Sequence, residues 1–223
     1  MHNGGITLES IFGLLISILY IVIIIAISTR LTHLPFEFSR TFTHILVMNW
    51  WLIATFFIKD YWLAITAPIL FVIFNTLNVI YNFIPAINTK RRDSNKGPIY
   101  YALAVFILTA ATFHTPSFHI VGGIGLLVMA YGDGFAALIG QKYGTHTYTI
   151  FKGHKTFEGS FTMLVVSMIV ITTYQYLQLG TVDFIQVFLL SLVATLVEAI
   201  SPFGIDNLFI PILVSLLYFI MIL

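Results

Sequence analysis

The stretch that decides the fold class is LESIFGLLISILYIVIIIAIST, residues 8–29, in which Glu9 is the only charged side chain. A transmembrane helix needs about 20 mostly apolar residues, so this run is long enough to cross a bilayer. Lipid offers no water to backbone groups, and the run is too long for a barrel strand, which leaves a helix. Comparable runs follow near residues 41–58, 61–84, 99–114, 117–140, 159–179, 183–200 and 206–222.

These runs predict an all-α, polytopic integral membrane protein of about eight transmembrane helices. Seven is the alternative, because the run at 99–114 is short for a full crossing. We find no internal repeat, low-complexity segment or linker, so residues 1–223 are expected to form a single transmembrane domain. The polar motifs concentrate between residues 130 and 210.

Composition supports the same fold class and excludes several functions. Hydrophobic residues make up 59% of the chain and charged residues 9%, whereas soluble domains carry roughly 45–50% and about 25%. The net charge of +1 gives no reason to expect a nucleic-acid partner. Cysteine is absent, which excludes disulfides, thiolate catalysis and cysteine-ligated metals.

The basic residues predict the orientation. Nine of the ten Lys and Arg residues fall in or beside the segments 30–40, 85–98 and 141–158, and the tenth, Lys59, lies in an alternate loop. The positive-inside rule makes the basic side cytoplasmic. Both termini are then expected outside, and the turn at 200–206 is expected on the cytoplasmic face with the other polar clusters.

The first polar cluster is GDGFAALIGQKYG, residues 132–144. On a helix, Asp133, Gly140 and Gly144 share one face. An ionisable residue in a span is costly and usually functional, so Asp133 is a candidate site residue. For Gly132, Gly140 and Gly144 two interpretations stay open: close packing of helices, for which Gly-xxx-Gly is a common motif, or room for a ligand beside the backbone.

The second cluster is KGHKTFEGS, residues 152–160, directly before a span. Amides at a helix N-terminus and nearby lysines suit an anionic phosphate, which makes candidates of Lys152, Lys155, Thr156, Gly159 and Ser160. It is not a Walker A loop. The alternative is a basic loop at anionic membrane lipids with Thr156 or Ser160 as a helix cap, but this leaves Glu158 unexplained.

The third cluster is EAISPFGIDN, residues 198–207. Ser201 to Gly204 is explained as a turn, and Asp206 could cap the following helix. Glu198, Asp206 and Asn207 offer the oxygen ligands that Mg²⁺ prefers, and Mg²⁺ accompanies nucleotide phosphates. Three further residues are possible accessory site residues with simpler explanations in packing or topology: Arg40, His44 and Lys96.

These three segments, in this order, resemble the membrane polyprenol kinase family, which includes dolichol kinase, phytol kinase and the CTP-dependent diacylglycerol kinase. Arg40-Thr41-Phe42-Thr43-His44 is similar to the family's early Arg-Lys-x-x-His element, with Thr41 where a lysine is usual. The segment from Lys96 to Tyr101 is similar to the one before the family's middle span. The resemblance runs from about residue 40 to 215, and its most specific part is 132–160.

The resemblance implies phosphoryl transfer from CTP, or another nucleoside triphosphate, to the hydroxyl of a membrane lipid alcohol. It implies that Asp133, with Asp206 or Glu198, holds Mg²⁺, and that Glu158 or Asp133 accepts the hydroxyl proton. Phosphates would be bound by Lys152, Lys155 and the amides near Thr156, Gly159 and Ser160, beside the glycine face of 132–144. The identity of the alcohol and the oligomeric state do not follow.

Two alternatives remain. CDP-diacylglycerol synthase, a related membrane cytidylyltransferase, shares the Asp-x-x-Ala-x-x-x-Gly-x-x-x-Gly element and a Lys-Thr-x-Glu-Gly loop, but its C-terminal Pro-Gly-His-Gly-Gly signature is absent from this sequence. A lipid or solute transporter would place polar groups near the membrane midplane, often in two repeated halves. Here the charges gather at the ends of the spans and no repeat is present, which favours the kinase.

Overall fold

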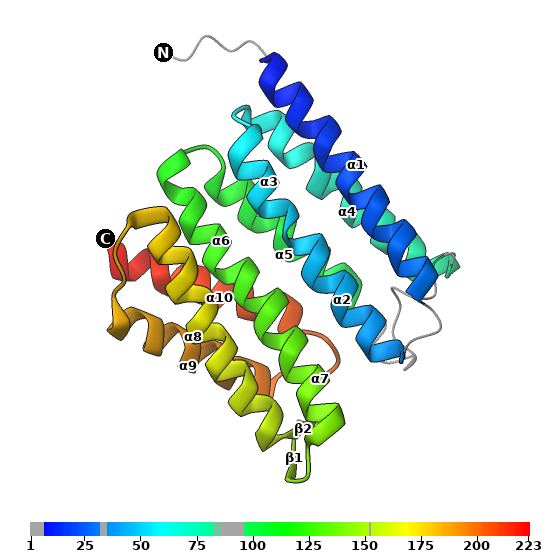
Figure 1. Ribbon diagram of the computed structural model, residues 1–223, viewed down its shortest axis with the longest axis vertical. Helices are drawn as coiled ribbons and strands as arrows, with labels where there is room; N and C mark the ends of the chain where they lie inside the picture. Colours follow the sequence, from blue (N-terminus) through cyan, green and yellow to red (C-terminus); the bar gives the residue numbers. More distant parts are fainter. Residues whose placement is uncertain (1–6, 32–34, 83, 85–95, 152) are drawn as a thin grey trace.

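The computed structural model describes residues 7–31, 35–82, 84, 96–151 and 153–223, and it is predominantly helical (Figure 1). The long elements are α1 (Leu8–Arg30), α2 (Phe36–Met48), α3 (Trp50–Phe57), α4 (Tyr61–Tyr81), α5 (Gly97–Thr112), α6 (His119–Leu127), α7 (Gly134–Tyr143), α8 (Phe157–Leu179), α9 (Phe184–Ile200) and α10 (Asp206–Ile222). Shorter elements are the 3₁₀ turn η3 (Pro116–Phe118), the π-helical segment η4 (Val128–Asp133), and the strands β1 (Thr147–Ile150) and β2 (Gly153–Thr156).

The prediction of an all-α membrane fold is confirmed. Within the described ranges, four helical segments are long and apolar enough to cross a membrane: Leu8–Arg30, Tyr61–Tyr81, Pro116–Tyr143 and Phe157–Leu179. Shorter apolar helices occur at Gly97–Thr112, Phe184–Ile200 and Asp206–Ile222. Helices lie where the sequence predicts each of the eight spans, and the number of spans that cross stays a prediction.

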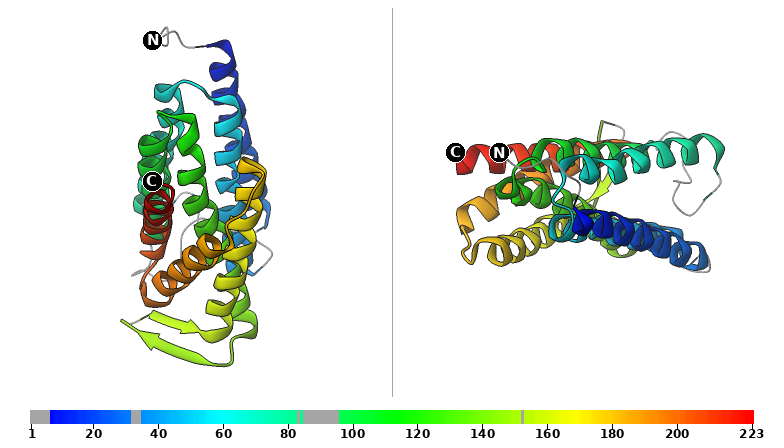
Figure 2. Two further views of the ribbon diagram at one scale, coloured as in Figure 1. Left: turned by 90° about the vertical axis from the view of Figure 1, so that its left-hand side faces the viewer. Right: turned by 90° about the horizontal axis from the view of Figure 1, so that it is seen from above.

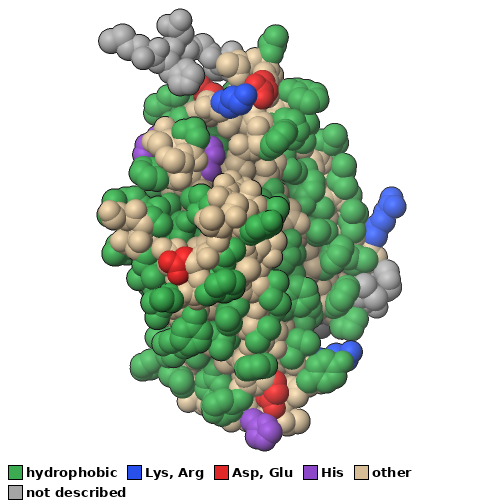
Figure 3. Space-filling view, turned by 60° about the vertical axis from the view of Figure 1, so that its left-hand side comes forward, with side chains coloured by type: hydrophobic (Ala, Val, Ile, Leu, Met, Phe, Trp, Pro, Cys, Tyr) green, Lys and Arg blue, Asp and Glu red, His purple; other side chains and the backbone are tan. Residues whose placement is uncertain are grey.

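Large apolar side chains cover the outside of the bundle. Figure 3 shows one face of the molecule, on which hydrophobic side chains cover most of the surface and charged side chains are few. Among the most exposed are Phe56, Trp62, Phe161, Leu177 and Ile185. A protein in water could not expose so large an apolar area, whereas a bilayer solvates it.

The centre of the bundle is the continuous helical segment formed by η3, α6, η4 and α7. In its most apolar window 78% of the residues are buried, compared with 22% in α1. It packs against α10 and α8, while α4 packs on α5 and α1 packs on α3 (Figures 1 and 2). Small residues permit this close packing: a Cβ on Gly125 would lie 2.2 Å from the carbonyl oxygen of Pro211 in α10.

Three local features were not predicted from the sequence. The predicted span 41–58 divides into α2 and α3 at Asn49, and the predicted span 117–140 contains the π-helical turns of η4. Residues 147–156 form an antiparallel hairpin in which Thr147 pairs with Thr156 and Ile150 with Gly153. The hairpin lies at the opposite end of the bundle from the start of α1 (Figures 1 and 2).

Helix ends meet beside this hairpin. The turn between α9 and α10 lies against β2, since a Cβ on Gly153 would be 3.7 Å from the Ser201 carbonyl oxygen. The same turn packs on the start of α5 at Gly204, which has a φ of +79° and would place a Cβ 2.9 Å from Gly97 Cα. Only glycine combines this backbone conformation with so close an approach. The fold thus brings the three polar clusters of the sequence to one place.

Candidate functional site

A polar cavity of about 410 Å³ lies where α2, α7, α8, β2 and the α9–α10 turn converge. Its lining includes charged side chains from all three sequence clusters and from the start of α2, which are Arg40, Asp133, Lys155, Glu198 and Asp206. Asn207, Thr156, Gly140 and Gly159 also line it. Candidate residues far apart in the chain are therefore neighbours around one cavity.

Lys155 links the second and third clusters. Its Nζ donates to Glu198 Oε1 at 2.6 Å and to Asp206 Oδ2 at 3.2 Å. The side chains of Glu198 and Asp206 are 5% and 9% exposed, and that of Lys155 is 20% exposed. In so dry a setting the ion pairs are little screened by water.

The hairpin is what aims Lys155 at these carboxylates. Tyr148 and Lys155 are paired in the β1–β2 register, so their side chains lie on the same face of the hairpin. The Tyr148 hydroxyl lies 2.5 Å from Ser160 Oγ, which in turn donates to Glu198 Oε2 at 3.2 Å. Glu198 is therefore held on one oxygen by Lys155 and on the other by Ser160.

The charge of Lys155 is stabilised by its surroundings. Burial alone would lower the pKa of this amine, but neighbouring carboxylates outweigh burial and raise the pKa of Lys155 above its ordinary value, in the order Asp206, Glu198 and Asp133. Lys155 therefore stays a cation at physiological pH, which suits it to attract an anion.

Asp133 lies at the end of η4, directly before α7, and its carboxylate reaches the cavity. A π-helical turn widens the helix by one residue and is often found at functional sites. Gly134, the next residue, packs on Thr41 of α2, where an added Cβ would lie 3.1 Å from Thr41 Cγ2. Thr41, which stands where the resembling family has a lysine, is thus a buried contact between α2 and α7.

The N-terminus of α8 faces the same cavity. Thr156 caps this helix by accepting a hydrogen bond from the Gly159 amide at 3.0 Å. Gly140 of α7 lies against this cap, where an added Cβ would be 2.8 Å from Thr156 Oγ1 and 3.4 Å from Gly159 Cα. The Gly140–Gly159 contact therefore both packs α7 on α8 and keeps the helix N-terminus open to the cavity.

The accessory candidates Arg40 and His44 lie at the margin of the polar cavity. Arg40 lines it directly, and both residues line a smaller cavity beside it. The His44 ring lies 4.2 Å from the Tyr101 ring, and the Tyr101 hydroxyl donates to the His44 carbonyl oxygen at 2.8 Å. Asn207 lines both cavities, and its Oδ1 is buried without a hydrogen-bond partner within the described ranges.

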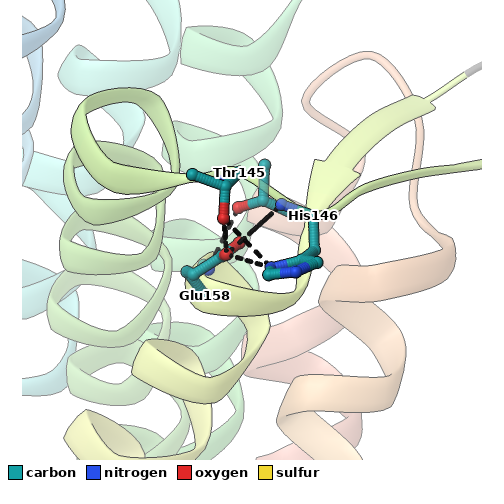
Figure 4. Close-up of polar contacts among 5 residues, drawn as sticks. Thr145, His146 and Glu158 are labelled. Atoms are coloured by element: carbon teal, nitrogen blue, oxygen red, sulfur yellow. Dashed lines mark hydrogen bonds and ion pairs between the residues drawn. The ribbon is translucent and has the colours of Figure 1, made fainter.

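Glu158 is directed elsewhere. Its Oε1 accepts hydrogen bonds from the Thr145 hydroxyl at 2.7 Å and lies 2.8 Å from His146 Nδ1 (Figure 4). Glu158 is not among the described residues that line the polar cavity. Its contacts tie the start of α8 to the segment that leads into the hairpin, and a catalytic role for Glu158 stays a prediction.

Four other candidates also lie away from the cavity or outside the description. An added Cβ on Gly132 would contact Met163 and Ser167 of α8, and one on Gly144 would contact Thr156, so both support the packing interpretation. Lys96 is exposed at the start of α5 and lines neither cavity as far as the structure is described. Lys152 lies outside the described residues.

Some features of the site were missed from the sequence. Tyr148 was not identified, although the alternation of Thr147, Tyr148 and Thr149 before a glycine is a weak signal for a strand. The direct pairing of Lys155 with Glu198 and Asp206 spans more than forty residues of chain, and no local pattern reports a contact of that kind.

Comparison with known proteins gives relatives of one kind. A phytol kinase of Synechocystis sp. is 31% identical over 189 residues, which cover 82% of this chain and 78% of that protein. A probable chloroplastic phytol kinase 1 of Glycine max is 36% identical over 126 residues, or 52% of this chain and 40% of its own length. Phytol kinase 1 of Arabidopsis thaliana chloroplasts is 32% identical over 113 residues, or 47% of this chain and 36% of its own length.

The chain spans less than half the length of these two plant relatives. No model of a protein family matches it, and no solved structure does. The cyanobacterial relative is more than 30% identical and is matched along most of both chains. The chain therefore belongs to the family of membrane polyprenol and phytol kinases.

Proposed function

We propose that this protein is a membrane kinase that transfers the γ-phosphoryl group of a nucleoside triphosphate, CTP in the first instance, to the hydroxyl of a lipid alcohol. The observation that carries the proposal is the cavity in which Lys155 and the N-terminus of α8 face the carboxylates of Asp133, Glu198 and Asp206. Phosphoryl transfer depends mostly on positioning and charge neutralisation, and these are what this arrangement offers.

The triphosphate is bound by positive groups on one side of the cavity. The dipole of α8 favours an anion at its N-terminus, beside Thr156 and Gly159. Lys155, fixed by its two carboxylate partners, adds a full charge at the same place. Lys152, outside the described residues, stays a predicted further contact. Arg40 contributes a cation from the α2 side.

In the transfer step the alcohol oxygen forms a bond to the γ-phosphorus while the bond from that phosphorus to the β,γ-bridging oxygen breaks. The products are the lipid monophosphate and the nucleoside diphosphate, and the hydroxyl proton must be accepted. Of the two acceptors expected from the sequence, Asp133 lines the cavity, whereas Glu158 is not among the described residues that do. We therefore assign the proton to Asp133.

The residues present fit a magnesium ion. Among the described residues, no group of three or more His, Asp or Glu side chains could enclose a metal. Mg²⁺ does not need such a cage, because it usually binds one or two carboxylates together with substrate phosphates and water. Asp206 and the unpartnered Asn207 Oδ1 would hold it, with Asp133 beside them, and the bound ion would neutralise charge on the triphosphate.

Glu198 takes a different role in this proposal from the metal ligand expected earlier. Both of its oxygens are engaged, one by Lys155 and the other by Ser160. We assign it the positioning of Lys155 and the local charge balance. Asp206 accepts from Lys155 on Oδ2 and from the Asn207 amide on Oδ1, so a metal held there would use the remaining lone pairs of these oxygens.

The two alternatives have less support. A cytidylyltransferase of the CDP-diacylglycerol synthase type would use the same cavity, but the relatives found along most of the chain carry the name phytol kinase. A transporter would need a polar route across the bundle. The polar cavity lies at one end of the bundle, and its described lining includes neither residue of the exposed Lys59–Glu9 pair at the opposite end.

The proposal is tested with purified protein in nanodiscs, given CTP, ATP, GTP or UTP and a panel of lipid alcohols in the presence of Mg²⁺. Mass spectrometry of the lipid fraction should show an alcohol monophosphate, formed fastest with CTP. A CDP-lipid made from phosphatidate, or no phosphorylated alcohol with any nucleotide, would overturn it.

The cytoplasmic location of the site, which the basic loops predict, needs its own test. Cysteines placed at Thr147 and Phe203, both exposed, should resist an impermeant thiol reagent added outside intact cells and react after permeabilisation. Labelling of both in intact cells would reverse the orientation.

A further inference from the structure

Two further cavities lie beside one another between the polar cavity and the middle of the bundle. The first, of about 130 Å³, shares Arg40, Gly204 and Asn207 with the polar cavity. The second, of about 260 Å³, shares Ile21, Ile25, Val47, Phe71 and Phe74 with the first. We call the first the neck and the second the chamber. Because they share lining residues, the three cavities lie next to one another in the order polar cavity, neck and chamber, and we call this series the path.

The character of the walls changes along this path. At the neck, His44 Nε2 and Asn207 Oδ1 are buried without a hydrogen-bond partner in the described part of the chain. Polar atoms left in this state are costly unless a ligand or water completes them. The chamber is lined almost wholly by apolar side chains of α1 and α4, with Val47, Met48 and Trp50 between them. The path therefore leads from charged, through polar, to apolar surroundings.

The path also runs along the helices, away from the site. On α4 the neck is lined by Asn75 and the chamber by Ala67, about two turns or 12 Å further along the axis at 1.5 Å per residue. On α2 and α3 the lining moves in the same sense, from His44 at the neck to Trp50 in the chamber. An extended chain with a polar head would fit this gradient with its head toward Asp133.

We propose that the neck and the chamber bind the lipid alcohol, with the hydroxyl at His44 and at one lone pair of Asn207 Oδ1, whose other lone pair is left for the metal, and with one hydrocarbon chain in the chamber between α1 and α4. The inference rests on the proposed function, because it names the part of the molecule that selects the acceptor. His44 and Asn207 position the hydroxyl, and the chamber sets which chains are accepted.

The neck favours a single-chain alcohol over diacylglycerol. It is the smallest of the three adjacent cavities, between a larger polar one and a larger apolar one. The two acyl chains of diacylglycerol branch next to the carbon that bears the hydroxyl, so both would have to enter the neck together. An isoprenoid alcohol carries one chain, which passes the neck and continues into the chamber.

The test narrows the chamber without touching the neck or the polar cavity. Ala67→Trp fills the chamber, and Ala26→Trp places the same side chain on the exposed face of α1, where it lines none of the three cavities. We measure kcat/KM for geraniol, farnesol and geranylgeraniol with both variants in nanodiscs. Ala67→Trp should leave geraniol nearly unchanged and lower geranylgeraniol by roughly 10-fold or more, whereas Ala26→Trp should change neither.

A second measurement does not depend on turnover. Geranylgeraniol with a diazirine at its far end is photolysed with the wild-type protein, and the labelled peptides are identified by mass spectrometry. Label should appear on α1 and α4 around Ile18 and Ala67, be displaced by excess geranylgeraniol, and be lost in Ala67→Trp but not in Ala26→Trp.

The two measurements separate the possible failures. Specific photolabelling without phosphorylation of any alcohol would sustain the lipid site and reject the proposed kinase. Phosphorylation with no displaceable label in α1 or α4, or an equal loss for short and long alcohols in Ala67→Trp, would overturn the chamber as the lipid site. Phosphorylation of dioleoylglycerol as fast as geranylgeraniol would overturn the selection of a single chain. Displacement of the label by phosphatidylcholine to the same extent as by geranylgeraniol would show that the chamber is a crevice for membrane lipids in general, and would overturn it as a specific alcohol site.

Discussion

Replacing Lys155 by methionine should separate the structural and chemical roles of the buried charge cluster. The change removes the cation that lies 2.6 Å from Glu198 and 3.2 Å from Asp206, while both carboxylates stay almost completely buried. Removing one partner of a buried pair typically costs about 3–5 kcal/mol, because the other charge is left without compensation. We therefore expect Lys155→Met to lower the free energy of unfolding by about 3 kcal/mol or more.

Activity should fall further than stability explains. Lys155 is assigned to the triphosphate, and loss of one preorganised group that stabilises transition-state charge typically costs about 10²–10³ in kcat. The assay is turnover in nanodiscs at a temperature well below the melting transition of the variant. Melting curves recorded in the same detergent and lipid without nucleotide report stability separately.

Two companion variants make the test specific. In Lys155→Met/Glu198→Gln/Asp206→Asn no buried charge of the cluster lacks a partner, so most of the lost stability should return while activity stays absent. Lys59→Met removes a cation from the exposed pair with Glu9, whose side chains are 65% and 51% accessible, and should change little. A Lys155→Met protein that is as stable and active as the wild type would refute both assigned roles.

Three more predictions concern the same site. Asp133→Asn keeps the side-chain volume but removes the charge, so turnover should fall by roughly 10²-fold or more, about 2.7 kcal/mol of transition-state stabilisation. The melting temperature without nucleotide should be unchanged or higher. A variant as active as the wild type would remove the role assigned to Asp133. Gly140→Leu should lower stability by about 1–3 kcal/mol and activity together, because its Cβ would lie 2.8 Å from Thr156 Oγ1; a melting curve identical to that of the wild type would contradict the packing. Because the pKa of Lys155 is raised, its charge and its stabilising effect are fully present below the ordinary lysine pKa of about 10 and are lost only as the pH rises through the higher folded value. Nucleotide affinity should therefore show no decline from deprotonation of this lysine up to about pH 9.5. A decline in that range that Lys155→Arg abolishes would contradict this.

Several parts of the fold follow from the sequence because lipid imposes a simple rule. Every long apolar run must become a helix, so each predicted span has a helical counterpart, as at residues 8–29 and α1. The hairpin at 147–156 escaped prediction because its strands are short and polar, and a polar loop between two spans offers no apolar period. The break at Asn49 and the π-helical turns before Asp133 are decided by packing between helices, which local propensity does not report.

Several residues that line the polar cavity were candidates from the sequence, whereas their roles stay predictions. Asp133, Lys155 and Asp206 stood out because ionisable residues in or beside spans need an explanation. Glu158 met the same criterion, yet its carboxylate is bound by Thr145 and His146, because the chain turns back on itself before α8 (Figure 4). The neck and the chamber were not predictable, because apolar residues that face lipid and apolar residues that face a cavity cannot be distinguished in the sequence.

The most direct test of the central claim is the fate of the individual phosphorus atoms of CTP. Purified protein is incubated with geranylgeraniol and CTP labelled at either the γ- or the α-phosphorus, and the lipid fraction is extracted. The account predicts that γ-label moves to the alcohol and α-label stays in the aqueous nucleotide. Transfer of α-label into the lipid fraction in the presence of phosphatidate, with no γ-label on any alcohol, would show a cytidylyltransferase and contradict the account.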